Sequence, residues 1–453
     1  MNKTHYDVFV IGSGIAGQTT AKMLVEKGLS VAITDIREYG GTCANRGCDP
    51  KKVLLQFADL VHYSENLKSS GVTDVPKIDW AAVQKFKSGF TDVVPMSTEK
   101  NLKKLGIKLY HQSPEFIDEQ SVMVEGKPVN ANYFVIASGL TPRTLEFKGN
   151  GLLLKSDDVL DLKELPKSAT FLGSGYVGME FAYLMSTLGV EVTMIDRGER
   201  PLRQFDTFLV DELTKRMTSK GVKFIANAEV LSVEKLRTNL RVVYNKEGKE
   251  HEQDSEVVIN TAGRVPSIAM LGLKNAKVDF DHQGVQVNSY LQSNSNPRVY
   301  ACGDVSNASL PLTPLSGLQG YIVASNILKA KSKEFQFPLV PSTVFTQPQI
   351  SSVGLSEKEA KDTYKDIQVY EGKVPNWFNA KKQQEDAYAF KIIANKRTRK
   401  IVGAHLLSAE ANEDINIMTT AINAGMTVDE FKRLIFTYPS YANDLKSMMK
   451  DDD

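Results

Sequence analysis

One pattern occurs twice in this chain, and it restricts the possible folds more than any other feature. Each copy starts with an apolar stretch, passes through a GxGxxG turn into a helical pattern, and closes with a second apolar stretch that ends on an acidic residue. The acid lies 23 positions after the first glycine in both copies, Gly12 to Asp35 and Gly173 to Asp196. Strand, glycine turn, helix and strand in this order predict two βαβ units with parallel sheets.

The glycines of the two copies indicate what such units bind. A dinucleotide fold needs glycine where the backbone turns tightly and where it approaches a pyrophosphate, which faces the N-terminus of the following helix. The closing acid is placed to accept a hydrogen bond from a ribose hydroxyl. Two dinucleotides in one chain imply that electrons or a hydride pass between them, as between a flavin and a nicotinamide. The glycines that meet this need are Gly12, Gly14 and Gly17 in the first copy and Gly173, Gly175 and Gly178 in the second.

A pair of cysteines gives the second chemical signal. Cys43 and Cys48 lie five residues apart in GGTCANRGCDPKK, directly before a helical pattern. The spacing is not that of a zinc site, and the remaining Cys302 lies in an apolar stretch, where a small core residue is expected. A helix N-terminus with nearby lysine lowers the pKa of a thiol. The pair is therefore predicted to carry two electrons by cycling between dithiol and disulfide.

The bulk composition excludes several classes of function. Lys+Arg is 55 and Asp+Glu is 54, so the formal net charge of the 453 residues is +1. Nucleic-acid binders and polybasic membrane-surface proteins need a cationic face, so neither a nucleic acid nor a membrane is expected as a partner. The sequence shows no apolar run of 18 residues, no export signal and only three cysteines. This combination predicts a soluble, cytoplasmic protein.

The chain resembles the flavin disulfide reductases, the family of glutathione reductase, dihydrolipoamide dehydrogenase and mercuric reductase. The motifs that carry this resemblance are spread over nearly the full length and are IGSGIAG, GGTCANRGCDPKK, VIASG, GSGYVGMEFA, TAGRVP, ACGDV and VFTQPQISSVGLSEKEA. The resemblance implies a homodimer with an α/β fold, in which two Rossmann-like dinucleotide-binding domains precede a C-terminal α+β dimerisation domain. The expected divisions are 1–149 for FAD binding, 150–266 for NAD(P) binding, 267–335 for the rest of the FAD-binding region, and 336–453 for dimerisation.

The resemblance also implies roles for single residues. Cys48 would be the thiol nearer the flavin, and Cys43 would exchange with the acceptor. Lys51 and Glu180 would form an ion pair beside the flavin, and Tyr176 would move aside for the nicotinamide. The other expected cofactor contacts are Asp35, Gly41, Thr42, Lys52, Ala137, Ser138, Gly139, Gly263 and Asp304, among which Ser138 stands where many relatives have threonine.

The sequence leaves the choice between NADH and NADPH open. Asp196 is placed to bind a ribose 2′-hydroxyl, and its charge would repel a 2′-phosphate, which favours NADH. Gly178, where other relatives have alanine, points the same way. Arg197 and Arg203, however, reproduce the RxxxxxR spacing of relatives that use NADPH, with Arg200 between them. Both nicotinamides remain candidates.

The C-terminal region departs from the disulfide-reducing members of the family. Those members carry His-Pro-Thr followed by glutamate, and the pair acts as acid and base at the thiols of the partner subunit. Here the matching stretch TYPSYANDLKSMM has Tyr438 and Asn443 at these places, and no histidine follows His405, which is expected to be a packed or edge-strand residue. A phenol with a reference pKa near 10 does not cycle protons readily at neutral pH. A simple disulfide is therefore a doubtful substrate.

These features predict an FAD-dependent NAD(P)H oxidoreductase that passes electrons through Cys43 and Cys48 to an acceptor other than a simple disulfide. A soft metal ion or a quinone-like molecule is the suspected acceptor. Mercuric reductases also lack the histidine, but they usually add a C-terminal cysteine pair, whereas this sequence ends MMKDDD. The alternatives are a disulfide reductase like glutathione reductase, a dihydrolipoamide dehydrogenase within a larger complex, and a redox-sensing flavoprotein.

Overall fold

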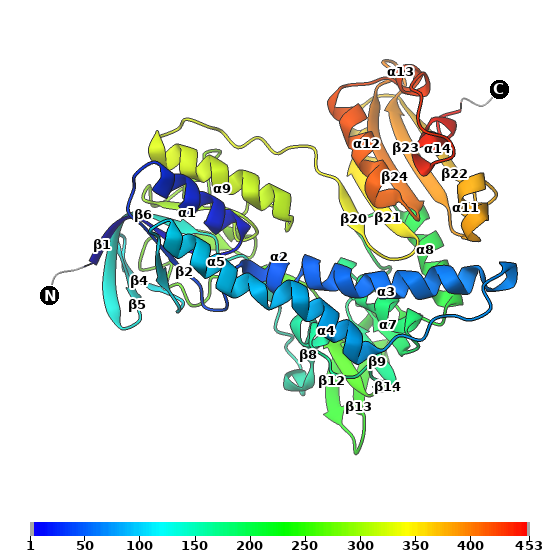
Figure 1. Ribbon diagram of the computed structural model, residues 1–453, viewed down its shortest axis with the longest axis horizontal. Coiled ribbons are helices and arrows are strands. Elements are labelled where there is room, and N and C mark those ends of the chain that lie inside the picture. Colours follow the sequence, from blue (N-terminus) through cyan, green and yellow to red (C-terminus); the bar gives the residue numbers. More distant parts are fainter. Residues whose placement is uncertain (1–3, 451–453) are drawn as a thin grey trace. The chain divides into compact units, whose positions relative to one another are not determined.

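The computed structural model describes residues 4–450 (Figure 1) and falls into two units. The first unit takes in the chain up to Lys51 together with Gln84–Arg143 and Gly263–Phe337, and the second takes in Lys52–Val83, Thr144–Ala262 and the chain from Pro338 onward. The expected divisions after residues 149, 266 and 335 therefore lie close to crossings between these units. The assignment of four functional segments stays a prediction.

The first unit is built on a mixed sheet that begins with the first glycine-rich copy. Strand β1 (Thr4–Ile11) pairs in parallel with β2 (Val31–Thr34) on one side and β6 (Lys127–Ile136) on the other. The inner half of β1 and all of β2 are buried, as expected for parallel strands covered on both faces. The sheet is extended in parallel by β3 (Lys108–Tyr110) and β19 (Val299–Ala301) and in antiparallel by β4 (Glu115–Asp118) and β5 (Ser121–Val124).

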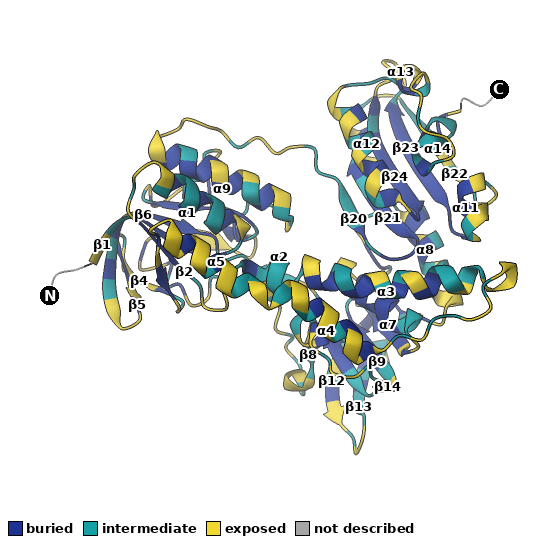
Figure 2. Cartoon of the chain, in the orientation of Figure 1, coloured by how far each residue is buried: buried dark blue, intermediate teal, exposed yellow. Residues whose placement is uncertain are grey.

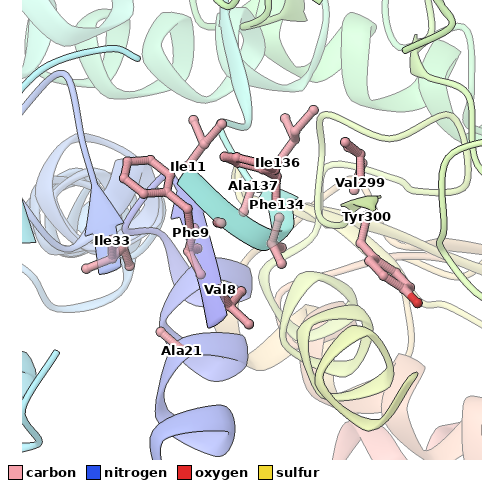
Figure 3. Packing of buried hydrophobic residues seen from close by; sticks show 14 of the residues in the cluster. Val8, Phe9, Ile11, Ala21, Ile33, Phe134, Ile136, Ala137, Val299 and Tyr300 are labelled. Carbon is pink, nitrogen blue, oxygen red and sulfur yellow. The ribbon is translucent and has the colours of Figure 1, made fainter. Parts of the chain in front are cut away.

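Two helices pack side by side in this unit, α1 (Ile15–Glu26) and α9 (Thr313–Leu328) (Figure 1). Gly320 allows their close approach, because a Cβ there would lie 2.5 Å from the Ala16 carbonyl oxygen. The Thr20 hydroxyl donates across the contact to the Gly320 carbonyl at 3.0 Å. Figure 3 shows the core of the unit, in which Phe9 and Phe134 project from neighbouring strands with ring centroids 6.1 Å apart.

The second glycine-rich copy forms the parallel sheet of the second unit. Strand β9 (Ser168–Leu172) lies between β10 (Glu191–Ile195) and β15 (Val257–Asn260), and helix α7 (Tyr176–Thr187) follows β9. The sheet is completed by β8 (Leu154–Lys155) and β11 (Lys223–Ile225). An antiparallel sheet of β12 (Ala228–Lys235), β13 (Leu240–Lys246) and β14 (Lys249–Ser255) is inserted before β15. Both copies thus fold as predicted.

The C-terminal part of the second unit is a five-stranded antiparallel sheet with helices. Its strand order is β20 (Ser342–Val344), β21 (Gln349–Gly354), β24 (Ile401–Ser408), β23 (Ala389–Asn395) and β22 (Ile367–Lys373). Helix α12 (Ala411–Asn423) packs on β21 and β24, and the inner strands are almost entirely buried (Figure 2). The expected architecture of two dinucleotide-binding units and a C-terminal α+β domain is confirmed.

Further helices and strands complete the described residues. The helices are α2 (Gly41–Arg46), α3 (Cys48–Asn66), η1 (Lys68–Ser70), α4 (Trp80–Thr91), α5 (Val93–Lys104), η2 (Asn150–Leu152), α6 (Ser156–Leu160), α8 (Thr207–Ser219), α10 (Glu357–Thr363), α11 (Phe378–Gln383), α13 (Val428–Lys432) and α14 (Tyr441–Ser447). The remaining strands form two small antiparallel pairs, β7 (Leu140–Pro142) with β16 (Arg264–Pro266) and β17 (Phe280–Asp281) with β18 (Gly284–Val285).

Two local expectations need correction. The sequence pattern predicts a helix over 428–435, but the helix ends at Lys432, because Phe436 turns back onto Phe431 with ring centroids 5.7 Å apart. Residues five apart do not face each other in a continuous α-helix. The edge-strand alternative for His405 is wrong, since β24 is the central strand of its sheet. His405 is buried and is hydrogen-bonded to the Ser352 hydroxyl and the Leu355 carbonyl.

Candidate functional site

The glycines of the first copy form a tight cradle. Gly12 has φ of +109°, and a Cβ there would lie 2.2 Å from the Ala137 carbonyl oxygen. A Cβ on Gly17 would lie 2.0 Å from the carbonyl oxygen of Gly12, and one on Gly41 would lie 2.4 Å from the Cα of Gly14. Side chains are therefore excluded from these positions, and the structure brings together residues that were predicted to contact FAD.

The start of helix α1 leaves backbone donors for a ligand. Gly14 is the N-cap residue and provides no side-chain cap, and the first turn has no acidic residue. The first N–H groups of a helix lack partners within the helix, and together with the helix dipole they attract an anion. This arrangement fits a pyrophosphate, as the glycine pattern predicts.

Asp35 closes the first copy by bonding back to the glycine loop. One of its carboxylate oxygens accepts from the backbone N–H and the hydroxyl of Ser13 at 2.8 and 2.7 Å, and the other accepts from the Arg37 N–H at 3.0 Å. These bonds fix the carboxylate at the end of β2. A ribose hydroxyl would meet an acceptor that is already held in place.

The second copy repeats this arrangement with its own residues. Gly173 has φ of +104°, Gly175 is the N-cap of α7, and its first turn carries no acid either. Asp196 accepts from the backbone N–H and the hydroxyl of Ser174 at 2.7 and 2.6 Å and from the Gly198 N–H at 2.7 Å. The two units therefore match in their hydrogen bonds as well as in their sequence pattern.

The arginines near Asp196 differ in their surroundings. Arg203 lies 3.8 Å from the Asp196 carboxylate, with a side chain that is 57% exposed. Arg200 donates to the backbone carbonyls of Leu202, Arg203 and Phe205 and thus braces its own loop. Arg197 is exposed. The roles of Arg197, Arg203 and Tyr176, which is 41% exposed at the start of α7, stay predictions.

Five further residues that were predicted to contact a cofactor lie in the first unit. Ser138 directly follows the cradle residue Ala137, and its hydroxyl is buried without a hydrogen-bond partner. Asp304 accepts from the Ser316 hydroxyl at 3.1 Å, and burial raises the pKa of its carboxyl. Gly139 and Gly263 both have positive φ, and Thr42 is half-buried in α2. An orphaned hydroxyl and a cradle closed to side chains fit bound FAD, which would supply a two-electron relay between NAD(P)H and thiols.

The cysteine pair lies where α2 gives way to α3. Cys43 is half-buried and Cys48 is exposed. Contrary to the lowering expected for a thiol near a helix N-terminus, the pKa of Cys43 is raised above its ordinary value, first by a hydrogen bond with Cys48 and then by burial, while a hydrogen bond with Thr313 opposes the rise. The two side chains are therefore close enough to interconvert between dithiol and disulfide. Which thiol meets the acceptor stays a prediction. Cys302 is fully buried, and burial raises its pKa to about 12, so it is the inert core residue that was expected.

Glu180, which is buried on helix α7, forms an ion pair with the partly exposed Lys52. Its carboxylate accepts from the Lys52 ammonium at 2.8 Å and from the Phe345 backbone N–H at 3.0 Å, and the Lys52 nitrogen lies 3.9 Å from the centroid of the Phe345 ring. Lys52 was expected to contact a cofactor, and Lys51 was expected to be the partner of Glu180. Lys51 is buried, and its pairing with Glu180 stays a prediction.

The C-terminal residues Tyr438 and Asn443 lie on either side of the start of α14. The Tyr438 side chain is 73% exposed in the segment between α13 and α14. The backbone N–H of Asn443 donates to the Ser440 hydroxyl at 3.1 Å, which caps the helix. These contacts do not test a catalytic role for Tyr438 or Asn443, and such roles stay predictions.

Among residues 4–450, no helix is long and apolar enough to cross a membrane. Within the same range, no group of three or more histidine, cysteine, aspartate or glutamate side chains is arranged to hold a metal ion.

Comparison with known proteins places these features in a family. Residues 6–323 match the family described as pyridine nucleotide-disulphide oxidoreductase, and residues 340–449 match its dimerisation domain. The chain belongs to the pyridine nucleotide-disulphide oxidoreductases. Among its relatives are a mercuric reductase of Staphylococcus aureus (30% identical over 97% of this chain and 81% of the relative) and a glutathione reductase of Burkholderia cepacia (30% identical over 99% of each). A dihydrolipoyl dehydrogenase of Bacillus subtilis is 28% identical over 96% of each.

Membership of this family establishes the broad chemistry. The protein is an oxidoreductase, a flavoprotein that uses FAD and NAD(P)H and has a redox-active cysteine pair. The dimerisation domain supports a homodimer. The resemblance inferred from the motifs is confirmed.

Four residues near these sites were not singled out from the sequence. Ser13 and Ser174 hold the two acids, and their equal places in the repeated GSG motif were a signal that could have found them. Thr313 and Asp49 contact the Cys43 thiol. Thr313 lies 270 positions after Cys43 in the sequence, so only folding brings it to the thiol.

Proposed function

We propose that this flavoprotein passes electrons from NAD(P)H through Cys43 and Cys48 to an acceptor other than a simple disulfide. The observation that carries the proposal is the exposed tyrosine at position 438, where the resemblance to disulfide-reducing family members implies a histidine. A cytoplasmic location, expected from the sequence, stays a prediction.

The chemistry of disulfide reduction explains why this position matters. When a thiolate attacks a disulfide, the departing thiolate must take up a proton, and a group that titrates near neutral pH supplies it. A phenol titrates near pH 10. Loss of a positioned acid or base costs about 10²–10⁴ in rate.

The two buried histidines of the second unit do not replace the missing one. His405 is buried between Ser352 and the Leu355 carbonyl. His62 is buried on α3, and its ring lies 2.8 Å from the Glu385 carboxylate. Both imidazoles serve hydrogen bonds inside the protein, which supports an acceptor that needs no proton donor.

A soft metal ion is the first candidate for the acceptor. Thiolates are soft ligands and bind such ions without releasing a thiol that must be protonated. A relative named mercuric reductase is 30% identical over 97% of this chain. A quinone-like molecule is the second candidate, because it could take electrons without exchange at Cys43.

The test is steady-state oxidation of NADH and NADPH by the FAD-loaded protein with a panel of acceptors. The panel contains Hg²⁺ with excess small thiol, a benzoquinone, glutathione disulfide and lipoamide. We expect turnover with one of the first two to exceed that with either disulfide by at least the factor of about 10² that an acid or base contributes. Cys43→Ser should abolish metal reduction and leave quinone reduction in place, which separates the two candidates.

Disulfide turnover would contradict the proposal. A rate in the ordinary range of about 1–10³ s⁻¹ with glutathione disulfide or lipoamide would show that position 438 does not decide the acceptor. The matched variant is Tyr438→His combined with Asn443→Glu, which we expect to raise disulfide turnover while the rate of flavin reduction by NADH stays unchanged.

A further inference from the structure

A carboxylate lies beside the thiol that is predicted to exchange with the acceptor. The Cys43 sulfur is 4.0 Å from the Asp49 carboxylate, to which its S–H donates. Gly47, between α2 and α3, permits this approach, because a Cβ there would lie 2.9 Å from the Thr42 carbonyl oxygen and 3.1 Å from the Cys43 Cα. The chain therefore turns sharply enough to place position 49 against position 43.

The positively charged side chains nearest in sequence to Asp49 do not face its carboxylate, so the negative charge of the carboxylate acts on the Cys43 thiol. Arg46, the cation of α2, pairs with Glu38. Lys51 lies two residues after Asp49 on α3, and residues two apart do not face each other on a helix. Thr313, the other neighbour of the Cys43 sulfur, contributes an uncharged hydroxyl. Asp49 is itself exposed, so its charge meets a molecule that approaches the thiol.

We propose that Asp49 determines specificity at Cys43 by favouring cationic and uncharged acceptors over anionic ones. The inference rests on the proposed function, because it takes Cys43 as the thiol that meets the acceptor. A negative charge 4 Å from the reacting atom disfavours a monoanion by about 1 kcal/mol in a water-like medium, which is about fivefold in rate. Glutathione disulfide carries several carboxylates and would be disfavoured more strongly.

The raised pKa of Cys43 agrees with this picture. Asp49 contributes to the rise as a nearby negative charge, behind the larger effects of Cys48 and burial. The same field that resists a negative charge on the sulfur resists a negative charge on an incoming reagent. Asp49 also lies in the first turn of α3, where an acid stabilises a helix, so the experiment must separate an electrostatic role from a structural one.

Two alkylating reagents of equal shape and different charge make that separation. The reduced FAD-loaded protein is treated with iodoacetamide, which is neutral, or iodoacetate, which is an anion, and Cys43 modification is followed by peptide mass spectrometry. Trypsin cleaves after Arg46 and places Cys43 and Cys48 on different peptides. The ratio of the two rates at Cys43 reports the local charge, because a purely structural change alters both rates together.

We expect Asp49→Asn to raise the iodoacetate to iodoacetamide ratio at Cys43 about fivefold at low salt. Asp49→Glu should keep the wild-type ratio. Glu26→Gln, which removes an exposed acid at the far end of α1, is the matched control and should leave the ratio unchanged. In the wild-type protein the ratio should rise with ionic strength, since salt screens exposed charges.

The inference falls if Asp49→Asn leaves the ratio within twofold of wild type. If that variant does not load FAD, a wild-type ratio that is independent of salt overturns it equally. Alkylation does not depend on the identity of the acceptor. If the protein turns over disulfides at an ordinary rate but the iodoacetate to iodoacetamide ratio depends on charge, only the proposed function is refuted. If disulfide turnover is weak but the ratio does not depend on charge, only the role of Asp49 is refuted.

Discussion

Replacing Gly17 by alanine should loosen the FAD cradle and lower the retention of FAD. A Cβ at this position would lie 2.0 Å from the Gly12 carbonyl oxygen and 3.2 Å from a methyl group of Val10. The first of these contacts must open by about 1 Å or more before the atoms stop overlapping. Helix α1 would have to move away from the loop that is expected to bind the pyrophosphate.

The expected cost follows from the chemistry of overpacking. Forcing one methyl group into a closely packed place costs about 1–3 kcal/mol. For a domain of 150–250 residues each kcal/mol lowers the melting temperature by about 2–4 °C. We therefore expect the first unit of Gly17→Ala to melt about 2–12 °C below that of the wild type. The measurements are release of flavin fluorescence on heating and the ratio of flavin to protein absorbance after desalting.

Two other glycines provide matched controls. Gly89 lies exposed in α4 with no atom within 4 Å of an added Cβ, and alanine there should be neutral or stabilise by about 0.5–1 kcal/mol. Gly178 is the equivalent of Gly17 in the second copy, where a Cβ would lie 2.5 Å from the Gly173 carbonyl oxygen. Gly178→Ala should weaken NADH binding in a fluorescence titration and leave FAD retention unchanged.

The reasoning is refuted if Gly17→Ala keeps its FAD and melts within about 1 °C of Gly89→Ala. Such a result would show that the helix and the glycine loop can separate without cost.

Two more outcomes are expected. Reduction by two electrons should produce a long-wavelength charge-transfer absorbance. Cys48→Ser should abolish this absorbance, whereas Cys43→Ser should show it without reductant. Identical spectra of the two variants would contradict the assigned roles. Burial and the neighbouring Glu410 raise the pKa of Asp414 from 3.8 to about 7, so the folded protein loses stability as pH rises from about 4 through 7. Asp414→Asn should therefore melt at a higher temperature than wild type above pH 7 and at the same temperature near pH 4. A difference in melting temperature that stays constant between pH 4 and pH 7 would contradict the assignment.

Sequence alone was sufficient for features that depend on residues close together in the chain. Each nucleotide loop was predictable, because the tight turn, the helix start and the closing acid lie within one βαβ unit. The positive φ of Gly12 and Gly173 follows from the same local requirement. The cysteine pair was equally visible, since Cys43 and Cys48 are neighbours along the chain. Position 438 was informative because it holds tyrosine where the family resemblance implies histidine.

Features that depend on strand order or helix rotation were not predictable in this way. Whether β24 is an edge or a central strand depends on strands that come from distant segments, so His405 could not be placed. The contact of Lys52 with Glu180 was not predicted either, because it depends on the rotation of a helix on which successive residues differ by about 100°. The packing of α3 against α7 and the chain near Phe345 brings the Lys52 ammonium to 2.8 Å from Glu180.

The two dinucleotide-binding units and the redox pair of cysteines could be predicted from the residues alone, because each depends on a short motif with strict backbone requirements. The surroundings of the thiols depend instead on how distant segments fold together. Thr313 reaches Cys43 from the start of α9, and Asp49 reaches it because the chain turns at Gly47. Contacts of this kind depend on how elements pack, and side-chain charge acts through distance in space rather than distance along the chain.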